Sequence, residues 1–79
     1  MVCDINKKKI RLTSVHDIIL FQECAEAVQG KVTVIKGSFT VDGKSLLGIM
    51  SLDVVDGIEV IYPAKAKEFE EVLMTFEIK

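Results

Sequence analysis

The chain has 79 residues, 49% of them hydrophobic, and a formal net charge of -2. This length indicates one domain over residues 1–79, whose folding buries only a little over ~60% of the unfolded surface. Charges of both signs are interspersed, so a nucleic-acid-binding face is not expected, and no apolar run approaches the ~20 residues of a transmembrane helix.

The first predicted element is a β-strand over residues 9–13, where apolar and polar residues alternate. Val2, Cys3 and Ile5 allow this strand to begin closer to the N-terminus, and the sequence does not fix its start.

A long amphipathic helix is predicted over residues 15–29. Thr13 and Ser14 are both acceptable N-caps, and Asp17 in the first turn complements the helix dipole. Gly30 stands where a C-terminal cap belongs. The side chains that we expect to share its core-facing stripe are Val15, Ile18, Ile19, Gln22, Ala25 and Val28, with Phe21 at the margin.

The middle of the chain predicts a β-hairpin. Residues 32–35 are a β-branched run and residues 39–41 form a short partner strand, with Gly37-Ser38 as the turn between them. A last strand is predicted over residues 58–62.

Pro63 ends that last strand because it cannot donate to a ladder, and it can also take the first position of a following helix. That helix is predicted from Ala64 onward. The apolar residues at helical spacing within it are Ala66, Phe69, Val72, Leu73 and Phe76.

Between the hairpin and the last strand lies the most informative stretch, residues 42–52. Ser45 is a good N-cap, because its hydroxyl can accept from backbone N–H groups of the next turn. The helix after it can only be short, since Gly48 weakens its interior. We expect some of its apolar residues to face outward, because so short a helix cannot bury all of Leu46, Leu47, Ile49 and Met50.

The predicted order is strand, helix, strand, strand, short helix, strand, helix. Strands outnumber helices and do not alternate strictly with them, which favours an α+β fold with the helices on one face of the sheet.

A family resemblance is carried by the residues after Lys44, which read Ser45-Leu46-Leu47-Gly48-Ile49-Met50-Ser51-Leu52. They resemble the second helix of the bacterial HPr phosphocarrier family, which opens with Lys-Ser and reads Ser-Ile-Met-Gly-Val-Met-Ser-Leu. The resemblance covers residues 15–73. It implies an open-faced β-sandwich, with a four-stranded antiparallel sheet in the order 1-4-2-3 and three helices on one face.

The chemistry of the HPr family lies at the start of its first helix, in the motif Gly-x-His-Ala-Arg-Pro-Ala. The histidine accepts phosphate from Enzyme I and passes it to sugar-specific subunits. Counting back from Ser45 without a gap, the place of the histidine falls on Ser14, that of the arginine on His16, that of the proline on Asp17 and that of the glycine on Leu12. The resemblance therefore implies a degenerate motif and a protein that is not an enzyme.

His16 is the alternative phosphoacceptor. It is the only histidine, and it lies near a helix N-terminus, where backbone N–H groups favour a phosphate. This role requires a two-residue shift, and Asp17, Ile18 and Ile19 then stand where the motif has alanine, arginine and proline. Asp17 also places a negative charge beside the phosphate. Arg11, the only arginine, could approach from the preceding strand.

Ser45 is the stronger candidate for a functional residue. In Gram-positive HPr proteins an ATP-dependent kinase phosphorylates the equivalent serine, and the product binds a carbon-control transcription factor. The catabolite-repression HPr of bacilli keeps the serine and lacks the histidine. We therefore expect a regulatory or binding protein whose partners contact Lys44, Leu46, Leu47 and Met50. Alternatively, Ser45 is only a helix cap and the apolar residues are only core.

No cofactor, metal site or independent enzyme is predicted, because the sequence has no paired-carboxylate, Cys–His or metal-ligand pattern. Cys3 and Cys24 indicate reduced thiols of a cytoplasmic protein. The expected partners are proteins: a kinase or a transcription regulator, or Enzyme I if His16 carries phosphate. Neither a nucleic acid nor a membrane is expected.

Overall fold

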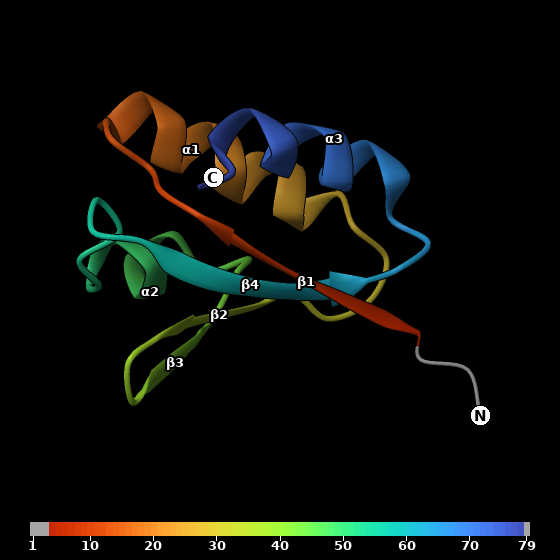
Figure 1. Cartoon of the computed structure of the whole chain (residues 1–79), viewed down its shortest axis with the longest axis horizontal. Helices are drawn as coiled ribbons and strands as arrows, with labels where there is room; N and C mark the ends of the chain where they lie inside the picture. The colour runs from red at the N-terminus through yellow and green to blue at the C-terminus, as the bar shows by residue number, and fades with distance from the viewer. Residues whose placement is uncertain (1–3, 79) are drawn as a thin grey trace.

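The computed structural model describes residues 4–78 and contains one four-stranded antiparallel sheet in the order β1-β4-β2-β3. The helices α1 and α3 lie side by side over one face of this sheet (Figure 1). The elements in chain order are β1 (Ile5–Ile10), α1 (Val15–Glu26), β2 (Thr33–Lys36), β3 (Phe39–Asp42), α2 (Leu46–Met50), β4 (Ile58–Pro63) and α3 (Lys67–Phe76). The predicted α+β fold and its sheet order 1-4-2-3 are confirmed.

The central strand β4 pairs with β1 on one side and with β2 on the other. Its residues alternate between the two faces: Ile58, Val60 and Tyr62 are buried beneath the helices, whereas Glu59 and Ile61 are half-buried on the open face. This alternation is what one covered face requires of a strand. The core that results is apolar, with no buried charged residue among residues 4–78.

Strand β1 begins and ends earlier than residues 9–13. The extension toward the N-terminus reaches Ile5, while Val2 and Cys3 lie outside the described residues. Beyond Ile10 the prediction of strand is wrong. There the backbone N–H of Leu12 donates to Val54 O at 3.1 Å. The chain thus leaves the strand ladder and continues toward α1.

Helix α1 is capped by Ser14, whose hydroxyl accepts the Asp17 N–H at 3.1 Å. The predicted end at residue 29 is wrong, because the helix ends at Glu26 with Ala27 as its C-cap. The chain then tightens into a single turn, in which the Val28 N–H donates to Ala25 O at 3.0 Å.

The predicted core-facing stripe of α1 is right in part, since Ile18 and Val28 contribute to the core as expected. Phe21 is buried at its centre because it packs against Phe69 of α3, with ring centroids 5.6 Å apart. Ala25 is buried on the same side, as expected. Val15 and Ile19, predicted to face the core, are exposed instead.

Helix α3 begins three residues later than predicted. Pro63 is the last residue of β4, as expected, but it does not open the helix, which starts at Lys67. The Ala64 N–H donates to Asp4 O at 2.8 Å, so the chain stays beside β1 before it can turn. Within α3 the predicted core positions Phe69 and Leu73 are buried.

A polar cluster joins α3 to the sheet above the core. The Glu70 carboxylate accepts the Tyr62 hydroxyl at 2.8 Å and the Asn6 side-chain amide at 3.1 Å. Burial, followed by this hydrogen bond, raises the pKa of Tyr62. The hydrogen bond from Tyr62 in turn holds the pKa of Glu70 below its ordinary value.

Candidate functional site

The segment before α2 is fixed by a tight turn. The Asp42 carboxylate accepts the Lys44 N–H at 2.9 Å, and the Gly43 N–H donates to Val32 O at 2.8 Å. A Cβ at position 43 would overlap the Val32 side chain, so only glycine fits here. The turn therefore delivers Ser45 to the start of α2 in one defined position.

Ser45 is the N-cap of α2, as predicted. Its hydroxyl accepts the Gly48 N–H at 3.1 Å, which satisfies one free donor of the first turn. A Cβ at Gly48 would lie 3.2 Å from the Cβ of Val41, so α2 sits close upon β3. The cap and this close approach together hold a helix of five residues in place.

Lys44 ties α2 to the end of α1. Its ammonium donates to Val28 O at 2.8 Å, just beyond α1, where exposed carbonyl groups favour a cation. The side-chain amide of Gln22 donates to Lys44 O at 2.9 Å from within α1. The Lys44 ammonium is therefore held at the end of α1, although Lys44 directly precedes Ser45 in sequence.

The apolar residues of α2 divide between core and surface. Ile49 is fully buried and Leu46 is half-buried. Leu47 is 84% exposed and Met50 is 50% exposed. The expectation that some of these side chains face outward agrees with the structure.

Helix α1 also has exposed apolar residues. Val15 and Ile19 precede Gln22 by seven and three residues, so all three share one face of α1, and Gln22 donates to Lys44 O just before α2. We call Leu47 and Met50 of α2 the apolar face. The sequence placed Val15 and Ile19 in the core. The signal that could have exposed the error is that apolar residues run almost all the way round residues 15–21, more than one contact surface can bury.

His16 is exposed in the first turn of α1, and no hydrogen bond or ion pair within residues 4–78 engages its ring. The side chains at the start of α1 are hydrogen-bonded locally: the Thr13 hydroxyl donates to the Asp17 carboxylate at 3.2 Å, and the Ser14 hydroxyl caps the helix. Arg11 instead lies close to Asp56. The pKa of that carboxyl is lowered mainly by the hydrogen bond and charge of Lys36, and less by Arg11.

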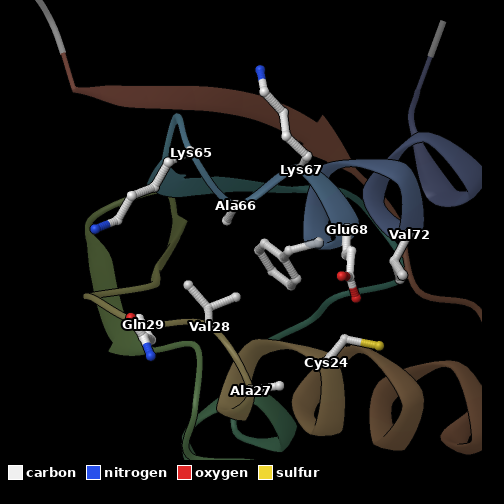
Figure 2. Close-up of a pocket in the computed structure, with 10 residues that line it drawn as sticks. Cys24, Ala27, Val28, Gln29, Lys65, Ala66, Lys67, Glu68 and Val72 are labelled. Carbon is white, nitrogen blue, oxygen red and sulfur yellow. The ribbon is translucent and has the colours of Figure 1, made fainter.

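Cys24 lines an open cleft of about 450 Å³ between α1 and α3 (Figure 2). In that view its thiol and the Glu68 carboxylate both point into the cleft, while Lys67 points away. Burial, and then the charge of Glu23, raises the pKa of the Cys24 thiol, which makes it a weak nucleophile.

The part of the chain that the structure describes holds no group of three side chains suited to a metal ion. Its helices are likewise too short or too polar for any of them to cross a membrane.

Comparison with known proteins identifies a protein family. The model of the family described as PTS HPr component phosphorylation site matches residues 9–77. The fold is similar to the crystal structure of a phosphocarrier protein HPr from Bacillus anthracis str. Ames, with a TM-score of 0.73 and 22% identity over 92% of this chain and 98% of that chain.

A second similar structure is HPr-C-His from Thermoanaerobacter tengcongensis, with a TM-score of 0.70 and 22% identity over 92% of this chain and 89% of that chain. No curated protein matches the sequence. At these identities the two structures establish the fold, while the family match spans nearly the whole chain. The chain therefore belongs to the HPr phosphocarrier family of the phosphotransferase system.

Proposed function

We propose that this HPr-family chain is a non-catalytic regulatory protein that binds protein partners through α2 and is controlled by phosphorylation of Ser45. The observation that carries this proposal is the exposure of Leu47 and Met50 on a helix whose first turn Ser45 caps. Exposed apolar side chains gathered on one surface are typical of a site for another protein. Lys44 and Leu46 border this surface.

The local chemistry suits a phosphate on Ser45. A phosphate adds roughly -1.5 to -2 charges at neutral pH, and negative charge is favoured at a helix N-terminus. Its oxygens can take over the Gly48 N–H that the hydroxyl now accepts. Leu47 and Met50 are exposed in the unmodified protein, so a phosphate on Ser45 would add charge beside an apolar face that is already open to a partner.

The partners follow from the family resemblance. Members of this family work with other proteins of the phosphotransferase system. For this chain we propose a serine kinase that uses ATP and a carbon-control transcription factor, both in a bacterial cytoplasm.

Parallel phosphorylation reactions test the proposal. The protein is incubated with a kinase of HPr proteins and ATP and, separately, with Enzyme I and phosphoenolpyruvate. Phosphate is then mapped by mass spectrometry under conditions that preserve phosphohistidine. We expect phosphoserine at Ser45 in the first reaction, absent from Ser45→Ala, and no phosphate on His16 in the second. A Ser45 that the kinase leaves unmodified contradicts the proposal.

A phosphocarrier role for His16 is the second candidate, favoured by the exposure of this ring in the first turn of a twelve-residue helix. In that role the ring accepts a phosphoryl group from Enzyme I. Stoichiometric, acid-labile phosphate that disappears in His16→Gln would reverse the ranking of the two functions.

A further inference from the structure

A polar recess of about 560 Å³ lies where β1 ends, β2 turns into β3 and β4 begins. Lys9 and Arg11 line it from the end of β1, Lys36 from the end of β2, and Asp56 and Gly57 from the loop before β4. Leu47, Met50 and Ser45 are not among its lining residues, so the recess is separate from the α2 surface.

Positive charge exceeds negative charge around this recess. Besides Lys9, Arg11 and Lys36, the acids Asp56 and Glu59 line it, and Glu59 pairs with Lys7 at 3.4 Å. Three cations therefore line the recess against two acids, a local surplus of one positive charge on a chain whose net charge is -2, and the Lys7 ammonium offsets the charge of Glu59 from outside the lining. Such a patch attracts an anion against the overall charge of the protein.

The cations of the recess are available to a ligand. Within residues 4–78 neither Lys9 nor Arg11 forms an ion pair. Lys36 pairs with Asp56 at 2.8 Å, but the Asp56 side chain is 76% exposed. Ion pairs this exposed contribute little stability, so a ligand can replace the Asp56 carboxylate at low cost.

The size and lining of the recess narrow the class of ligand. Its volume falls within the ~300–1,000 Å³ of small-molecule sites. An arginine presents a planar fork to two oxygens of a phosphate, and a lysine adds a point charge. The apolar residues that complete the lining suit a short carbon body, and they are Ile35, Val55, Ile58 and Ile78.

We propose that this recess binds a small phosphate monoester, with the phosphate held by Lys9, Arg11 and Lys36 in the place that the Asp56 carboxylate now occupies. Asp56 then acts as an internal competitor, and removing its charge strengthens binding.

Titration of the full chain with phenyl phosphate, followed by backbone amide NMR shifts, tests this site. We expect saturable shifts at Arg11, Lys36 and Gly57. Arg11→Gln should weaken binding by roughly tenfold, the loss expected for one hydrogen bond between charged groups. Asp56→Asn should tighten it. Lys65→Gln, which removes a lysine from the cleft between α1 and α3, is the matched control and should leave the affinity unchanged.

The comparison ligands are phenol and an acidic peptide. Phenol alone should leave these amides unmoved. The proposal is overturned if phenyl phosphate gives no saturable shift, if its shifts survive in both Arg11→Gln and Lys36→Gln, or if phenol reproduces them. It is also overturned if only the acidic peptide moves these amides, because the cations then serve a protein surface. The backbone N–H of Arg11 donates to Phe76 O, and Arg11→Gln keeps this hydrogen bond, so the variant should fold.

Discussion

Ser14 and Ser45 do the same structural work at the start of two helices. Each hydroxyl accepts a backbone N–H three residues later, at 3.1 Å in both cases. Their surroundings differ: Ser14 is exposed beside Asp17, whereas Ser45 is half-buried between two tightly packed glycines, Gly43 and Gly48. A change at Ser45 therefore reaches the packing of a whole helix.

Replacing the Ser45 hydroxyl separates its cap role from its charge. Ser45→Ala should lower the free energy of unfolding by about 1 kcal/mol, because the Gly48 N–H loses its acceptor. Ser45→Asp should retain most of the stability, since its carboxylate caps and complements the helix dipole. Urea denaturation measures both changes, with Ser38→Ala in the exposed hairpin turn as the control. An aspartate as costly as alanine would contradict the cap assignment.

The hydrogen bonds that Glu70 accepts predict that the protein loses stability in acid. Its carboxylate accepts two hydrogen bonds, and its pKa in the folded protein is lowered, chiefly by the Tyr62 hydroxyl. The folded state thus holds a proton on this group less tightly than the unfolded state. The stabilisation is present above the ordinary glutamate pKa of about 4.3 and is lost as the pH falls through the lowered value.

Glu70→Gln tests this directly through urea denaturation at several pH values. The variant should be less stable than the wild type at pH 7, and the gap should narrow as the pH falls below about 4. Glu68→Gln, an exposed neighbour on α3, is the control and should follow the wild-type curve. A gap that stays constant with pH would show that the ionised carboxylate does not stabilise the fold.

Packing stabilises helix α2, and intrinsic helix propensity does not. Five residues are far too few for a stable isolated helix, so Ile49, the Ser45 cap and the close approach to Val41 must fix it. Its sequence revealed the cap and the short length. The family resemblance pointed to Leu46, Leu47 and Met50 as contact residues, and Leu47 and Met50 are exposed whereas Leu46 is half-buried. Periodicity alone could not select them, because that depends on where β3 and α1 lie.

Ile49 and Leu47 form a matched pair for this element. Ile49→Ala should cost roughly 2–5 kcal/mol, as for other fully buried aliphatic side chains. Leu47→Ala should change stability by less than about 0.5 kcal/mol, because the side chain is on the surface. Thermal and urea unfolding measure both. A large loss for Leu47→Ala would place this residue in the core and remove it from the apolar face.

Helix α1 shows the limit of sequence periodicity for an element. The 3.6-residue spacing identified the helix and the burial of Ala25, but Val15 and Ile19 proved to be exposed. Apolar residues surround its first turns, so spacing alone cannot select the inward face. The contact between Phe21 and Phe69, which are far apart in sequence, selects it.

At the scale of the whole molecule, element order predicted an α+β fold, and the family resemblance carried by the Ser45 stretch implied the strand order that the sheet has. Contacts between distant segments were beyond the sequence. Asn6 and Glu70 meet across 64 residues, and the recess of Lys9, Arg11 and Lys36 draws on separate strands. None of these contacts leaves a local pattern, because each depends on strand pairing that local propensity does not encode.

The central claim is that partners bind at α2 and respond to the charge on Ser45. The most direct measurement is the affinity of a carbon-control transcription factor for the unmodified and the Ser45-phosphorylated protein, by calorimetry. Leu47→Ala is prepared in both forms. We predict that phosphorylation tightens binding by about tenfold or more, as one or two new charge-assisted hydrogen bonds would, and that Leu47→Ala weakens the phosphorylated complex. Equal affinities for the two forms, with no effect of Leu47→Ala, would contradict the claim and leave Ser45 as a helix cap.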